Sequence, residues 1–189
     1  MFKYKMEVIA RCIDRIKCEE INALETGTIR SYNERHESTR WLGENIQNGH
    51  IISIDIEPKS IEISKDICKH LNNITWIQGD SLDVLKTQPE NHFDFILLDS
   101  VNNKDHIFEE FKIALKLIKL GGIIMIDDFG VDKKGTVPDH TQPLAVKGVK
   151  VYDELVKHNF KKELYLHQSR KGVQGIILSV NEELKDFNF

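Results

Sequence analysis

The sequence predicts an α/β protein with one doubly wound, mostly parallel sheet of seven strands in a three-layer α/β/α arrangement. Short apolar segments typical of strands alternate along the chain with segments whose apolar residues recur at helical spacing. Several strand segments are apolar almost throughout, as expected where helices cover both faces of a sheet. A short link at residues 168–172 joins the last two strands, so we expect a C-terminal antiparallel strand.

The first half of the chain alternates helices and strands. Strands are expected in three apolar segments, at residues 21–25, 50–55 and 74–77. Helices are expected where apolar side chains return every three or four positions, at residues 4–19, about 39–46, 58–71 and 81–85. Ser38 or Thr39 can cap the second helix, and Pro58 is tolerated in the first turn of the third.

The second half repeats the alternation and then ends in a hairpin. Strands are expected at residues 93–98, 123–126, 161–167 and 173–180. Helices are expected at residues 107–118 and 145–158, and Gly121-Gly122 is expected to stop the first of them. Residues 128–144 contain glycine and proline without apolar periodicity, which predicts a long loop.

Length and composition favour an ordinary globular domain. With 189 residues, 40% of them hydrophobic and 30% charged, we expect a single domain over 1–189, with an N-terminal helix in 1–20 and the core in 21–180. A net charge of −4 does not favour nucleic acid as a partner. No apolar run approaches the roughly 18 residues of a membrane span, and the first residues do not read as a secretory signal. The three cysteines lack metal-site spacing, so a reduced, cytoplasmic protein is expected.

Acidic residues follow the predicted strands at five points along the chain. They are Glu25, Asp55, Asp80, Asp99 and the pair Asp127-Asp128. The carboxyl ends of parallel strands share one edge of a sheet, and ligands bind in the crevice outside that edge. A row of carboxylates there suits a ligand rich in hydroxyls and amines. The pattern favours a nucleoside-type cofactor, with S-adenosylmethionine as the best candidate.

Five short motifs in this order resemble the class I S-adenosylmethionine-dependent methyltransferases, especially small O-methyltransferase-like members, over about residues 20 to 180. The resemblance implies a Rossmann-like sheet. Glu25-Thr26-Gly27-Thr28 is similar to the first motif, which implies that Glu25 and Gly27 bind near the methionine end of the cofactor. The chain departs from the family in having no second glycine at 29–36. Ser38 and Thr39 either bind the cofactor carboxylate or serve only as helix caps.

Asp55 and Gly79-Asp80-Ser81 resemble the second and third motifs. The resemblance implies that Asp55 accepts hydrogen bonds from both ribose hydroxyls, with Glu57 ranked lower for this role; the alternative is a turn cap before Pro58. It also implies that Asp80, with Ser81 beside it, accepts from the adenine amine. Asp80 can equally cap the helix that begins at Ser81, and both roles can hold together.

Asp99, Asp127 and Asp128 resemble the metal site of catechol-type O-methyltransferases. Hard oxygen ligands suit a divalent cation such as Mg²⁺, Mn²⁺ or Ca²⁺. The family pattern commonly ends in Asp-Asn, whereas this chain has Asp-Asp. The alternative is that Asp99 contacts cofactor or substrate without a metal and that Asp128 caps a turn.

The function expected from this resemblance is O-methyl transfer to a small-molecule acceptor, by a monomer or a homodimer. Asp99 and Asp127 are candidate catalytic residues, and His106 and His140 are candidate general bases because histidine titrates near neutrality. Two alternatives are a non-catalytic cofactor-binding module and a nicotinamide-dependent oxidoreductase, although the latter normally carries a Gly-x-Gly-x-x-Gly turn that is missing here. Lys147 and other lysines near the C terminus are expected on a solvated face.

Overall fold

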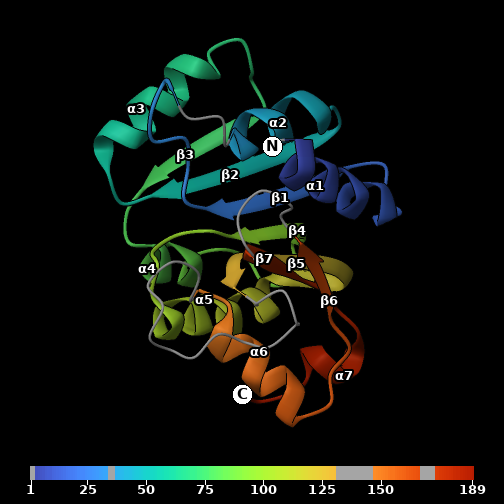
Figure 1. Ribbon diagram of the computed structural model, residues 1–189. Coiled ribbons are helices and arrows are strands. Elements are labelled where there is room, and N and C mark those ends of the chain that lie inside the picture. The colour runs from blue at the N-terminus through green and yellow to red at the C-terminus, as the bar shows by residue number, and fades with distance from the viewer. Residues whose placement is uncertain (1–2, 34–36, 131–146, 167–172) are drawn as a thin grey trace.

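The computed structural model describes residues 3–33, 37–130, 147–166 and 173–189 (Figure 1). The strands are β1 (Ile21–Thr26), β2 (Gly49–Asp55), β3 (Ile74–Gln78), β4 (Phe93–Leu98), β5 (Ile118–Gly130), β6 (Glu163–Leu166) and β7 (Val173–Ser179). The helices are α1 (Lys3–Arg15), α2 (Ser38–Asn45), α3 (Pro58–Ile67), α4 (Ser81–Lys86), α5 (Lys104–Leu117), α6 (Val149–Lys157) and α7 (Glu182–Lys185).

The seven strands form one sheet in the order β3-β2-β1-β4-β5-β7-β6. Strands β1 to β5 pair in parallel, and β7 runs antiparallel to both of its neighbours, β5 and β6. This confirms the predicted fold class. The strand order reverses direction between β1 and β4, and such a switch point is where ligands bind in open α/β sheets.

Helices lie on both faces of the sheet (Figure 1), and a hydrophobic core fills the space between each helical layer and the sheet. On one face, Ile9 of α1, Leu42 of α2 and Ile51 of β2 belong to one core cluster, and α3 completes the layer. On the other face, Phe111 of α5 packs against Ile96 of β4, together with residues of α4, α6 and α7. Helices therefore cover both faces, and the carboxyl edge of the sheet is left for a binding site.

Strand β5 is longer than the sequence pattern predicts. The prediction that Gly121-Gly122 stops α5 is wrong, because the helix ends at Leu117 and Ile118 already pairs with Phe93 of β4. At its other end the strand continues past Ile126. The register of its pairing with β7 shifts there, and the pairing then continues. Asp128 lies within this irregularity with a positive φ of 55°. Such a bulge re-aims side chains without ending the pairing.

A short C-terminal helix, α7, was not predicted. The side chain of Asn181 caps it by accepting a hydrogen bond of 2.9 Å from the backbone N–H of Leu184. No helix within the described ranges has both the length and the apolar character needed to cross a membrane.

Candidate functional site

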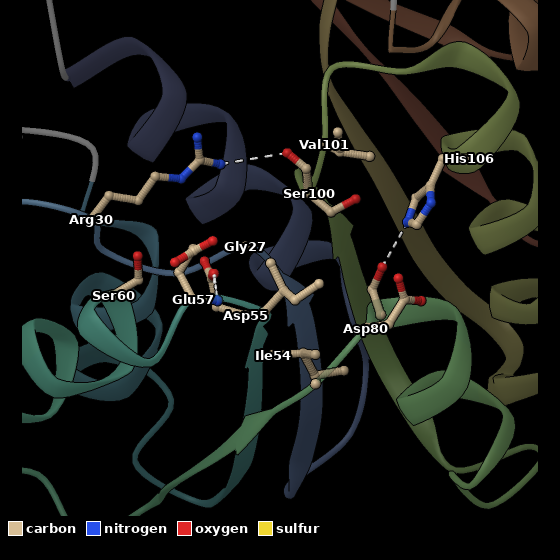
Figure 2. A pocket seen from close by; sticks show the side chains of 13 residues that line it. Gly27, Arg30, Ile54, Asp55, Glu57, Ser60, Asp80, Ser100, Val101 and His106 are labelled. Atoms are coloured by element: carbon tan, nitrogen blue, oxygen red, sulfur yellow. Dashed lines mark hydrogen bonds between the residues drawn. The ribbon is translucent and has the colours of Figure 1, made fainter.

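A pocket of about 400 Å³ lies at the carboxyl ends of β1, β2, β3 and β4, at the switch point of the sheet. Figure 2 shows groups that follow β1 and β2 across the pocket from groups that follow β3 and β4. The residues that line the pocket include Gly27, Arg30, Asp55, Asp80, Val101 and His106. The pocket therefore gathers most of the predicted motifs in one place.

Gly27 is required by the backbone just after β1. Its φ is +88°, and a Cβ atom there would lie 2.5 Å from the carbonyl oxygen of Asp99. The Gly27 N–H donates to the carbonyl of Ile54 at 2.7 Å. A side chain would thus separate the ends of β1 and β4, so glycine serves the close approach of these two strands at the floor of the pocket.

The carboxylate of Asp55 is held in a fixed orientation at the end of β2. Its Oδ2 accepts from the backbone N–H of Thr28 at 3.1 Å, and its Oδ1 accepts from that of Glu57 at 2.9 Å. The turn-capping role is therefore present in the structure. Each carboxylate oxygen can accept a second hydrogen bond, so Asp55, which also lines the pocket, keeps the capacity to bind hydroxyl groups.

Asp80 also has a structural role and a place in the pocket. Its side chain caps α4 by accepting from the Leu82 N–H at 2.9 Å, which confirms the predicted cap. Beside it, Ser81 Oγ lies 2.8 Å from Nε2 of His106. The candidate base His106 is therefore located next to the third motif, where the resemblance places adenine.

Glu110 is a buried carboxylate that was not predicted as part of the site. It accepts from Thr26 Oγ1 at 3.1 Å and from Ser100 Oγ at 2.6 Å, and its Oε1 lies 3.2 Å from His106 Nε2. The hydrogen bond to Glu110 is the main cause of a raised His106 pKa. The sequence contains one sign that Glu110 is buried. It follows Ile107 by three positions and so lies on the apolar face of α5.

Three apolar side chains line the pocket, the buried Ile54 and the more exposed Ile56 and Val101. Ile56 and Val101 line it, yet their residues are 58% and 49% exposed to solvent. Ligand sites commonly combine such apolar surfaces with a few oriented polar groups. No sequence pattern distinguishes Ile56 and Val101 as site residues, because single exposed apolar residues are common on protein surfaces.

Glu25, Ser38 and Thr39 are buried and are not among the residues that line the pocket. Ser38 Oγ and Ser53 Oγ donate to the Glu25 carboxylate at 3.0 and 2.8 Å. Burial raises the pKa of Glu25 to about 7. Thr39 Oγ1 lies 3.0 Å from Thr28 Oγ1, so these groups hold the loop after β1 against α2. Their contacts with a cofactor stay predictions.

Ser38 and Thr39 do not cap α2. The residue before the helix is Glu37, and its side chain makes no capping hydrogen bond. Ser38 is instead the first helical residue, and its hydroxyl is directed to the buried Glu25.

Asp99, Asp127 and Asp128, here called the carboxylate cluster, meet at the carboxyl ends of β4 and β5. One oxygen from each lies within 4.8 Å of the others. Lys5 Nζ lies 2.8 Å from Asp99 Oδ2 and 2.6 Å from Asp127 Oδ2. Lys147 Nζ lies 2.5 Å from Asp99 Oδ1 and 3.2 Å from Asp128 Oδ2. The structure thus brings the three predicted residues together, with two lysines among them.

The lysines dominate the electrostatics of this cluster. Burial acts to raise the pKa of Asp99, but the ammonium groups of Lys5 and Lys147 outweigh it and hold that pKa well below its usual range. Burial acts to lower the pKa of Lys5, and the Asp127 and Asp99 carboxylates reverse this and raise it. Tyr165 donates to Asp127 Oδ1 at 2.7 Å, and burial together with Asp127 raises the pKa of this phenol.

Neither lysine was expected at this place. The side chain of Lys147 is only 5% exposed, so its assignment to a solvated face is wrong. Lys5 lies on α1, far from Asp99 in sequence, and no local pattern connects the two. His140, the other candidate base, lies outside the described residues.

Known proteins of similar sequence or fold indicate the family of this chain. The sequence matches the family described as "Methyltransferase domain" over residues 35–176. No curated protein matches the chain. Among solved structures, the chain is similar to the O-methyltransferase TomG of Streptomyces achromogenes, involved in tomaymycin synthesis and solved with S-adenosylmethionine. The identity is 23% and the TM-score 0.67, over 94% of this chain and 79% of that one.

Two other solved structures show how widely the fold is shared. An O-methyltransferase from Bacillus cereus, in complex with S-adenosylhomocysteine, is 24% identical with a TM-score of 0.67, over 93% of this chain and 78% of that one. An rRNA methylase from Streptococcus thermophilus is 12% identical with a TM-score of 0.68, over 96% and 99% of the two chains. At these identities the structures support the fold, and the family match covers most of the chain. The chain therefore belongs to the methyltransferase domain family and shares its fold with class I S-adenosylmethionine-dependent methyltransferases.

Proposed function

We propose that this protein transfers the methyl group of S-adenosylmethionine to an oxygen atom of a small-molecule acceptor. The observation that carries the proposal is the pocket at the switch point, where two fixed carboxylates, Asp55 and Asp80, lie at the ends of adjacent strands. Several structures of similar fold are O-methyltransferases, two of them solved with the cofactor or its demethylated product.

The pocket residues suit the nucleoside part of the cofactor. Asp55 is suited to accept from the ribose hydroxyls, because each of its oxygens already holds one backbone N–H and can take a second donor. Ile56 and Val101 offer apolar surfaces for the planar adenine ring. Asp80, at the start of α4, is suited to accept from the adenine amine.

Arg30 is suited to bind the carboxylate of the cofactor's methionine part. It lines the pocket beside Gly27, and its guanidinium lies 3.4 Å from the carbonyl oxygens of Asp99 and Ser100 (Figure 2). A guanidinium is planar, always charged and has paired N–H donors, so its geometry matches a two-pronged bond to a carboxylate. Ser38 and Thr39, the residues predicted for this role, have their hydroxyls engaged with Glu25 and Thr28.

The reaction requires positioning more than bond activation, because the cofactor's sulfonium is already a good leaving group. An acceptor oxygen attacks the methyl carbon in line with the carbon–sulfur bond. The new carbon–oxygen bond forms as the carbon–sulfur bond breaks, S-adenosylhomocysteine is released, and the hydroxyl proton passes to a base or to water. The carboxylate cluster, at the ends of β4 and β5, is the proposed acceptor side of the site.

His106 is better suited to the adenine side than to proton transfer at the methyl group. Its Nε2 is shared between Ser81 and Glu110, and the Asp80 carboxylate also acts to raise its pKa. We therefore infer that His106 orients Ser81 and the adenine-binding loop. His140 and water remain the candidates for the base that accepts the proton of the acceptor hydroxyl.

Calorimetry with S-adenosylhomocysteine tests the cofactor assignment. Asp55→Ala is expected to weaken binding by about 1–3 kcal/mol, because two ribose hydroxyls lose their acceptor. Asp80→Asn is expected to weaken it less, because an amide oxygen still accepts. Asp66→Asn and Asp83→Asn, on the exposed sides of α3 and α4, are matched controls that should bind normally. Unchanged affinity in Asp55→Ala would reject the ribose assignment.

The competing functions predict different results. The antiparallel β7 between β5 and β6 departs from the 3-2-1-4-5-6 order of the dinucleotide-binding sheet, so we expect no nicotinamide cofactor to bind with comparable affinity. Mass spectrometry of reactions with phenolic and other hydroxyl-bearing acceptors separates an enzyme from an inactive cofactor-binding module. The module would bind S-adenosylmethionine without releasing S-adenosylhomocysteine.

A further inference from the structure

The resemblance to catechol-type enzymes implies a divalent cation on the carboxylate cluster, and the residues present test that implication. Three carboxylates at this spacing are suitable hard ligands in principle. However, both oxygens of Asp99 hold a lysine ammonium group, one from Lys5 and one from Lys147. Both oxygens of Asp127 are also engaged, one by Lys5 and one by the Tyr165 hydroxyl. The cluster therefore does not fit a bound metal while these contacts persist.

The charges lead to the same conclusion. Lys5 and Lys147 together carry two positive charges, which equal the charge of one divalent ion, against the three carboxylates. A metal ion added to this arrangement would bring positive charge next to two buried ammonium groups, at a large Coulomb cost. The lysine side chains are 6% and 5% exposed, so they cannot leave the carboxylates for water without a rearrangement of the site.

The two lysines come from separate parts of the chain. Lys5 extends from α1 on one face of the sheet, and Lys147 precedes α6, which packs on the other face. Their contacts with Asp99 span 94 and 48 positions in sequence. Each of the two flanking layers thus contributes one lysine ammonium group to the same aspartate, Asp99.

We propose that Lys5 and Lys147 take the place of the divalent cation in the carboxylate cluster, so that the acceptor side of the site is completed without a metal. This proposal rests on the proposed function only in naming the carboxylate cluster as the acceptor side of the site. Its evidence is the set of ion pairs, and its test needs neither cofactor nor acceptor.

The test is a Mn²⁺ titration followed by electron paramagnetic resonance, with thermal unfolding as a second readout. The purified wild-type protein is expected to leave Mn²⁺ free in solution and to keep its melting temperature in excess Mg²⁺ or chelator. In the double variant Lys5→Met, Lys147→Met the three carboxylates lose both cations. It is expected to bind one Mn²⁺ at least about tenfold more tightly than the wild type, with a higher melting temperature when Mn²⁺ is present. Lys150→Met is the matched control, because Lys150 is 39% exposed and pairs with Asp105 outside the cluster.

Each result decides the proposal. One Mn²⁺ bound by the wild type, and lost in Asp99→Asn, would overturn it. A folded double variant that binds no more Mn²⁺ than Lys150→Met would also overturn it, because the lysines would then not stand where a metal can bind. If the double variant does not fold, the wild type and Asp99→Asn still decide whether the native cluster takes a metal. Failure of the proposed function would appear separately, as absent binding of S-adenosylhomocysteine.

Discussion

Glu25 makes the stability of this protein depend on pH in a direction opposite to that of most carboxylates. Its side chain is fully buried, and burial raises its pKa to about 7 from an ordinary value of 4.5. Below pH 4.5 the group is protonated in both the folded and the unfolded chain. Between these two pKa values only the folded chain holds the proton, so stability is lost as the pH rises through this window.

The size of the effect follows from the two pKa values. A difference of one unit corresponds to about 1.4 kcal/mol, and integration between about pH 5 and pH 8 gives a loss of about 2.5 kcal/mol from this group alone. Glu25→Gln removes the titration and keeps a side chain of the same shape. Ser38 and Ser53 can hydrogen bond to the amide, one as donor and the other as acceptor. The variant should therefore be more stable than the wild type at about pH 8 and similar to it at about pH 5.

Urea unfolding followed by tryptophan fluorescence across this range measures the effect. The quantity of interest is the difference in unfolding free energy between wild type and Glu25→Gln at each pH, because other titrating groups cancel in it. Glu62→Gln, an exposed position on α3, is the control and should leave the wild-type profile unchanged. Parallel profiles for wild type and Glu25→Gln would show that Glu25 is not a raised-pKa acid and would refute this reasoning.

Two further predictions concern the backbone and the buried network. Gly27→Ala should lower the unfolding free energy by about 2–4 kcal/mol in urea unfolding, because it combines a positive φ with a Cβ only 2.5 Å from the Asp99 carbonyl oxygen. Gly121→Ala, whose φ is also positive but whose Cβ would meet nothing within 4 Å, should cost only about 1–2 kcal/mol; equal losses would contradict the steric argument. Glu110→Gln should lower the pKa of His106 measured by NMR, because Glu110 is the main cause of its raised value, and an unchanged pKa would contradict the hydrogen bond between them.

The fold could be predicted where local pattern alone determines an element. Strand β4 has the predicted bounds, Phe93–Leu98, because all six of its residues are buried and a turn precedes it. The far end of β5 could not be predicted, because it depends on pairing with β7 across a bulge near Asp128. A sequence pattern shows which residues avoid water, but it does not show which distant strand will supply the next hydrogen bonds.

The residues of the candidate site also differ in whether a local sequence pattern could predict them. Asp55 and Asp80 could be found because a carboxylate at the end of an apolar strand has a defined position in this class of sheet. Arg30 could not be selected from the polar loop after Gly27, where nothing distinguishes it from its neighbours. Lys5 could not be predicted for a different reason, since its partners, Asp99 after β4 and Asp127 in β5, lie far along the chain.

The strand-end carboxylates look alike in sequence but differ in what they can bind. Glu25 is buried among hydroxyl groups and its pKa is raised, whereas Asp99 is held by two ammonium groups and its pKa is lowered. Asp55 and Asp80 take their hydrogen bonds from backbone N–H groups and face the pocket. A neutral nucleoside can compete for the spare lone pairs of such a carboxylate, but it cannot displace an ammonium group from a buried ion pair, because that would leave two unpaired charges. The partners of each carboxylate therefore divide the edge of the sheet into a part that keeps lone pairs for a ligand and a part whose carboxylates are paired with the chain's own lysines.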